Sequence, residues 1–256
     1  MSSVNMSEQT ARGKTYVTAM TVGSAAKTTL ARHVLLPHTR GARIISVESA
    51  TPDEQATDLY QRGQDQVREM LRFELFARAA DDKIIDCGVT DSEMAAELLT
   101  EVATLGRAQH ITVVLPVLID PKGLRGLEHF GGLLPAPMRK VAVLTRVRDA
   151  ATAQKFLIGK VGAAVTRYCC EHGIALCPIP FLHSDLLDSD AAVHAVALRG
   201  RTLEAVAALD LDALSSQTAP DREHAAQFGL LIGAAAMAPA AIENARAIYQ
   251  WIVEQE

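Results

Sequence analysis

The feature of this 256-residue sequence that most constrains its fold is an alternation between short apolar runs and longer amphipathic runs. The run HITVVLPVLI lacks the polar alternation of a half-exposed strand,. Unbroken apolar strands separated by helices are typical of a mainly parallel sheet with helices on both faces. With right-handed crossovers this is an α/β doubly wound fold. We expect strands over residues 15–20, 42–48, 83–88, 110–119, 140–147 and 173–181.

The amphipathic runs predict helices between these strands. We expect helices from Thr28 to Pro37 and over residues 52–80, 92–105 and 150–173,. The polar segment 1–14 reads as a flexible tail,. Residues 15–256 are expected to form a single domain, whose segment 190–256 is mainly helical.

Composition excludes several classes of protein. The net charge of −5 argues against a generally basic nucleic-acid binder,. The N-terminal segment has no apolar core, so it is no signal peptide, and the apolar stretch 228–242 is shorter than the roughly 20 residues of a membrane span,. The cysteines have no metal-binding spacing and read as reduced thiols,. We therefore expect a cytoplasmic protein with no membrane association.

A turn that could hold phosphate follows the first expected strand. Phosphate loops combine inward-facing backbone N–H groups with a lysine and with a hydroxyl that ligates Mg²⁺, and Lys27 and Thr28 stand at those two positions. The expected nucleotide-binding residues are Gly23, Ser24, Ala25, Ala26, Lys27, Thr28 and Thr29. The consensus G-x-x-x-x-G-K-[ST] is not met, because Thr21 and Ala26 replace its glycines. The stretch could equally be an alanine-rich helix start capped by Ser24.

Acidic residues at two other strand ends favour the nucleotide-binding interpretation. Asp86 closes the third expected strand and would help to hold Mg²⁺, while Gly88 would let the backbone approach a γ-phosphate,. Glu48 closes the second strand and could orient a water molecule. A structural alternative remains for each acid: Asp86 could cap the helix that begins near Ser92, and Glu48 could be a solvated loop acid, which is the better interpretation for Glu48. The candidate catalytic residues are Lys27, Asp86 and Glu48, and the candidate metal ligands are Thr28 and Asp86.

With these motifs the chain resembles the ParA/MinD-type phosphate-loop ATPases, and within them the StbB-like plasmid stability and conjugation proteins. The matching segments are GSAAKTT, from Gly23 to Thr29, and DCGVTD, from Asp86 to Asp91, followed by the strand VVLPVLIDPKG. The resemblance covers roughly residues 15–180. It implies binding of ATP with Mg²⁺, ATPase activity, and a role in plasmid stability, plasmid partition or conjugative DNA transfer. The preference for adenine rests on the resemblance alone.

The chain departs from that family at three places, which bear in turn on contact with a partner subunit's nucleotide, on nucleotide affinity and on the rate of hydrolysis. Val22 replaces a signature lysine, Ala26 replaces the last loop glycine, and VESATP replaces the D-x-D-P-Q run after the second strand. Two alternatives follow. The chain could be a binding module without turnover, or a small-molecule kinase or ligase of the dethiobiotin synthetase type. The second alternative would use Lys122 and Arg125, although a solvated basic loop explains these two residues better.

The expected partners are ATP or ADP, a second copy in a homodimer, or a plasmid-encoded DNA-binding protein. A weak non-specific contact with DNA would need one basic patch; the candidates are Arg139, Lys140, Arg146, Arg148, Arg199 and Arg201. Solvation of separate loops is the simpler interpretation of these residues. The C-terminal stretch 242–256 has an apolar stripe but only one arginine, so we expect it to pack on the domain or on a second subunit and not on a membrane,.

Overall fold

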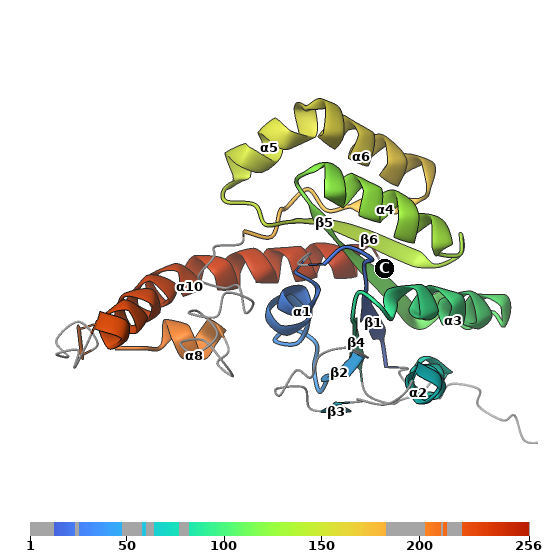
Figure 1. Cartoon of the computed structure of the whole chain (residues 1–256), viewed down its shortest axis with the longest axis horizontal. Helices are drawn as coiled ribbons and strands as arrows, with labels where there is room; N and C mark the ends of the chain where they lie inside the picture. Colours follow the sequence, from blue (N-terminus) through green and yellow to red (C-terminus); the bar gives the residue numbers. More distant parts are fainter. Residues whose placement is uncertain are drawn as a thin grey trace, which may run out of the picture.

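The centre of the molecule is a seven-stranded parallel sheet with the strand order β3-β2-β4-β1-β5-β6-β7 (Figure 1). The computed structural model describes residues 13–23, 26–47, 58–59, 64–76, 82–182, 203–210, 212–213 and 222–255. The strands are β1 (Thr15–Thr18), β2 (Arg43–Val47), β3 (Asp58–Leu59), β4 (Lys83–Cys87), β5 (Ile111–Leu118), β6 (Arg139–Thr145) and β7 (Ile174–Leu176). The predicted α/β doubly wound fold with a parallel sheet is confirmed.

The sheet is wound outward from β1, which pairs with β4 on one side and β5 on the other. The chain first builds the β2 side of the sheet and then crosses to the β5 side, so the order reverses next to β1. In open α/β sheets, ligands bind beyond the carboxyl ends of the strands at such a reversal point. The loops that follow β1, β4 and β5 lie at this place.

Helices cover both faces of the sheet. One face carries α2 (Gln64–Phe76), α3 (Ser92–Thr104), α4 (Pro121–Leu133), α5 (Ala150–Ile158) and α6 (Lys160–Glu171). The other carries α1 (Lys27–Leu30), its π-helical continuation η1 (Ala31–Leu35), and the end of α10 (Arg222–Glu254). Each face packs into its own buried apolar cluster, and alternate residues of the strands serve the two clusters. Tyr16 of β1, for example, points to the α10 side and Val17 to the opposite side.

Three expectations about local structure are wrong. The expected helix over residues 52–80 is interrupted, because Asp58–Leu59 pair with β2 as a short edge strand and α2 begins only at Gln64. The basic stretch after β5 is not a loop but helix α4, whose start is capped by Asp120. The expected helix over residues 150–173 is divided into α5 and α6 at Gly159, whose backbone is extended.

The C-terminal helix α10 packs on the domain, as predicted for residues 242–256. Ala245, Ile248 and Ile252 are fully buried against η1 and the sheet, and the ring of Tyr249 lies 6.3 Å from that of Tyr16. The part of α10 before Pro239 extends away from the sheet and is accompanied by α8 (Leu203–Ala207), as Figure 1 shows. Among the described helices, none is long and apolar enough to span a bilayer.

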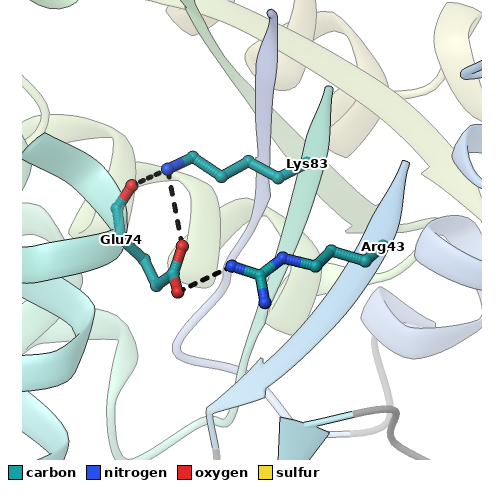
Figure 2. Close-up of polar contacts among 3 residues, drawn as sticks. All are labelled: Arg43, Glu74 and Lys83. Atoms are coloured by element: carbon teal, nitrogen blue, oxygen red, sulfur yellow. Dashed lines mark hydrogen bonds and ion pairs between the residues drawn. The ribbon is translucent and has the colours of Figure 1, made fainter. Parts of the chain in front are cut away.

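A buried ion cluster joins α2 to the amino ends of β2 and β4. Glu74 of α2 lies between the side chains of Lys83 and Arg43 (Figure 2). Arg43 donates to Glu74 Oε1 at 2.9 Å, while Lys83 Nζ donates to the Glu74 carbonyl and lies 3.5 Å from Oε2. Glu74 and Lys83 are buried, whereas Arg43 is half-exposed. This triad fixes α2 on the sheet at the edge opposite the β1–α1 loop.

Candidate functional site

The turn between β1 and α1 contains a strained residue directly before the helix. Ala26 adopts a left-handed conformation, with φ 65° and ψ 31°, immediately before Lys27 begins α1. Left-handed backbone costs a residue with a Cβ roughly 1–2 kcal/mol relative to glycine. Ala26 therefore has a backbone conformation that favours glycine, as the expected loop position does. Ser24 and Ala25 lie outside the described residues.

The carboxylate of Asp86 lies at the centre of the site, near the carboxyl end of β4. Its Oδ2 accepts a hydrogen bond from Thr28 Oγ1 at 2.6 Å, and its Oδ1 accepts one from Thr18 Oγ1 at 2.7 Å. Burial raises the pKa of this carboxyl group, against the two threonine hydrogen bonds and the positive charges of Lys27 and Arg32,. The structure thus brings the two expected metal ligands, Thr28 and Asp86, into direct contact. Asp86 does not cap α3, whose N-cap position is held by Asp91.

Ser92 links the loops that follow β1 and β4. Its hydroxyl accepts a hydrogen bond from Met20 N at 3.2 Å and lies 2.7 Å from Gly88 O and 3.1 Å from Met20 O, to either of which it can donate. The N–H of Gly88 donates to Val47 O at 2.7 Å, so this amide is engaged with the end of β2. Gly88 would have to leave Val47 before its amide could face a phosphate.

Two of these contacting residues were not predicted as site residues. Thr18 contacts Asp86 because the two are paired across β1 and β4 in the parallel register. The register could have shown this once the two strands were assigned as neighbours. Ser92 was expected only at the start of a helix, and nothing in the sequence indicates its contact with Met20. Glu48, the remaining expected catalytic residue, lies outside the described residues.

A cleft of about 570 Å³ opens beside the β1–α1 loop. It is lined by Val22, Gly23, Leu118, Ile119, Asp120, Lys122 and Arg146. The loop is pressed against α4 at one wall, because a Cβ on Gly126 would lie only 2.4 Å from Val22 Cγ2. Val22, at the position of the family's signature lysine, therefore packs onto the protein's own helix.

The basic residues of β6 do not form a single patch. Arg139 begins this strand, while Arg146 and Arg148 follow its opposite end. Lys140 is buried and donates to His172 O at 2.9 Å, so it is not accessible to a DNA phosphate. Arg199 and Arg201 lie outside the described residues. The basic residues of β6 therefore do not share the one face that a DNA contact would need, and separate surroundings, the preferred interpretation, fit them better.

No protein-family model matches the chain, and no curated protein sequence matches it significantly. What the site can do must therefore follow from its own geometry. Within the described ranges, no three His, Cys, Asp or Glu side chains gather into a metal-binding cluster. A cation at this site would be held by the oxygens of Thr28 and Asp86 together with ligands from a bound molecule or water. Such a mixed oxygen environment is what Mg²⁺ commonly adopts in phosphate sites.

Proposed function

We propose that the chain binds a nucleoside triphosphate with Mg²⁺ at the β1–α1 loop and is a ParA-like ATPase with weak or slow turnover. The observation that carries this proposal is the 2.6 Å hydrogen bond between Thr28, in the first turn of α1, and the buried Asp86. A hydroxyl and a carboxylate in contact, next to a lysine at a helix start, supply hard oxygen ligands and a cation for phosphate.

Each residue has a defined role in this proposal. Lys27 neutralises charge on the outer phosphates, and the Thr28 hydroxyl ligates the metal. Asp86 orients Thr28 through their hydrogen bond and would supply carboxylate oxygen to the metal,. Burial raises the pKa of Asp86 because the ionised carboxylate is poorly solvated there, in spite of its threonine hydrogen bonds and the charges of Lys27 and Arg32,. A divalent cation would favour the ionised form further.

Two features support slow turnover. The Gly88 amide is engaged with Val47 O, so contact with a γ-phosphate requires a rearrangement of the β4–α3 loop. Val22 brings no charge to the loop and is packed against Gly126. A switch that changes partners slowly is compatible with the proposed role in plasmid stability, plasmid partition or conjugative DNA transfer. The proposed partners are a second copy of the chain or a small DNA-binding protein, and adenine remains the proposed base.

The cleft beside Gly23 favours a second candidate function, transfer of a phosphoryl group to a small molecule. Its volume lies within the range of small-molecule sites,. Lys122 lines it, whereas Arg125, the other residue that this alternative would use, does not. Release of phosphate from Mg-ATP without any added substrate would support the ATPase. Nucleotide binding without any release would support a binding module or an enzyme that awaits its acceptor.

The proposal is tested by calorimetric titration of the parent protein and of Lys27→Ala with Mg-ATP, Mg-ADP and Mg-GTP. A charge-assisted contact contributes about 1.5–3 kcal/mol, so we expect Lys27→Ala to weaken Mg-ATP binding roughly ten- to a hundredfold. Lys155→Ala is the matched control, because Lys155 is an exposed lysine of α5. Equal affinity of the parent protein and Lys27→Ala would refute the phosphate-loop proposal.

A further inference from the structure

The cleft beside the β1–α1 loop holds two cationic residues that the nucleotide site described above does not use. Lys122 comes from the first turn of α4, and Arg146 directly follows β6. They line the same cleft as Gly23, although one lies in a helix that follows β5 and the other lies just after β6. The cleft therefore has two positively charged residues in its lining together with Gly23, the first residue of the expected phosphate loop.

The backbone that carries Lys122 is held firmly against the end of β5. Asp120 Oδ1 accepts hydrogen bonds from Lys122 N at 2.7 Å and from Gly123 N at 2.9 Å, which fixes the start of α4. A Cβ on Gly123 would lie 2.0 Å from Leu118 O, so the helix begins in close contact with the end of β5. These contacts fix the position of the Lys122 backbone relative to the carboxyl end of β5.

The backbone of Arg146 is held in a conformation that favours glycine. Its φ is 56°, whereas its neighbours Thr145 and Val147 are fully buried. Residues kept in sparsely populated backbone regions persist only where the surrounding structure imposes them, and they cluster at functional sites. The backbone between the two buried neighbours thus places an exposed arginine at the cleft despite the strain.

The charges of the cleft define the ligand that it would take. Lys122 and Arg146 contribute two positive charges and Asp120 one negative charge. One oxygen of Asp120 already accepts from the amides of α4. Because lysine and arginine form strong charge-assisted hydrogen bonds with phosphate and carboxylate oxygens, we propose that Lys122 and Arg146 form an oxyanion site next to the phosphate loop. This inference rests on the proposed nucleotide site for its position.

The oxyanion could belong to the outer phosphate of the nucleotide or to a separate molecule that bears a phosphate or carboxylate. Both sources offer phosphate or carboxylate oxygens to Lys122 and Arg146, but they predict different binding preferences. In the first case the two residues favour a triphosphate over a diphosphate. In the second case they bind a free anion while Mg-ADP occupies the loop.

The test uses Lys122→Ala and Arg146→Gly, each compared with the parent protein. Glycine suits the backbone at position 146 and so removes the guanidinium group without adding strain. Arg125→Ala is the matched control, because Arg125 is an exposed cation of α4 outside the cleft lining. Calorimetry measures binding of Mg-ADP, of a non-hydrolysable Mg-ATP analogue, and of inorganic phosphate in the presence of Mg-ADP.

If the nucleotide is the source, both variants lose about tenfold of the preference for the ATP analogue over ADP, and Arg125→Ala keeps it. If a separate molecule is the source, nucleotide affinities stay unchanged and phosphate binding falls about tenfold in both variants. The inference is overturned if neither quantity differs from that of Arg125→Ala. If the parent protein binds no nucleotide, the proposed function alone is refuted. The oxyanion site is still supported if the parent protein binds inorganic phosphate without nucleotide and both variants lose this binding. It is overturned if both variants keep it.

Discussion

Strand β4 carries a buried charged residue near each of its ends, and the two are stabilised in different ways. At the amino end, Lys83 lies beside Glu74, which also accepts from Arg43, so opposite charges meet within the chain. Toward the carboxyl end, Asp86 accepts hydrogen bonds from two threonine hydroxyls, and the charges of Lys27 and Arg32 favour its ionised form. Of the contacts that the structure describes, those of Lys83 are with a charged residue and those of Asp86 are with neutral hydroxyls.

The nature of the contacting partners distinguishes the structural cluster from the proposed binding site more clearly than the pKa shifts do. Burial lowers the pKa of Lys83, against the favourable charge and hydrogen bond of Glu74, and burial also raises the pKa of Asp86. Both shifts have the same leading cause, and structural ion networks perturb pKa values as active sites do. What differs is the partner. Glu74 and Lys83 have each other, whereas Asp86 would gain from a cation brought by a ligand.

The largest expected effect is a loss of stability when the triad is broken. Glu74→Ala leaves Lys83 buried without its carboxylate, and removal of one partner from a buried ion pair costs about 3–5 kcal/mol,. Urea unfolding measures the loss. Glu101→Ala is the control, because its pair with Arg72 is exposed and such pairs contribute about 0–1 kcal/mol,. Equal losses in the two variants would show that the triad contributes no more than a surface pair.

At the carboxyl end of β4 we expect a substitution to raise the free energy of unfolding and not to lower it. Asp86→Asn removes a poorly solvated charge, so the free energy of unfolding without ligand should rise by about 0.5–2 kcal/mol, the usual range when a functional group is replaced by a better-accommodated one. Nucleotide binding should lose its dependence on Mg²⁺. Thermal unfolding and calorimetry with and without Mg²⁺ measure the two effects. A variant less stable than the parent protein would indicate that Asp86 is a structural residue like Glu74.

The pH dependence gives an independent check on Asp86. Its pKa in the folded protein lies above the ordinary value of 3.8, so between the two values the folded state binds more protons than the unfolded state. The stability contributed by this group therefore falls as pH rises through that window and is constant above it. We expect the stability advantage of Asp86→Asn to grow with pH across the window and then to level off. An advantage that does not change with pH would contradict the raised pKa.

The smallest expected effect concerns the strain in the loop. Ala26→Gly relieves a left-handed conformation, and we expect about 0.5–1 kcal/mol more stability together with tighter Mg-ATP binding,. Ala31→Gly is the control, since Ala31 has a helical backbone with φ −57° and glycine there costs about 1 kcal/mol,. Chemical denaturation of both variants gives the comparison. Changes of the same sign would mean that the backbone of Ala26 is not strained.

Sequence reasoning predicted the sheet and much of the site for one physical reason. Unbroken apolar runs such as that of β5 must be buried on both faces, and parallel strands then place their carboxyl ends at one edge,. That places Lys27, Thr28 and Asp86 at a common edge without any knowledge of side-chain contacts. The left-handed geometry of Ala26 was open before the structure, because it depends on the path of the loop.

What the sequence did not reveal depends on tertiary contacts. Helix α4 contains several glycines, which are poor helix formers, yet it forms because Gly123 and Gly126 let it pack closely on the end of β5 and on Val22,. The triad was missed because Arg43 and Glu74 are 31 residues apart in sequence, and each alone reads as a solvated charge. The triad forms because the strand order places β2, which carries Arg43, beside β4, which carries Lys83.

The length of α10 has a mechanical consequence. Its C-terminal part is clamped on η1, which continues the helix that Lys27 begins, and the part before Pro239 carries α8. Proline lacks the N–H that would bond the carbonyl of Ala235, so the helix can bend there,. At about 1.5 Å per residue, the part before the proline is a lever arm of about 25 Å, and a bend of about 10° moves its tip by about 4 Å. A small change of angle at Pro239 would thereby become a large displacement at the far end of the molecule.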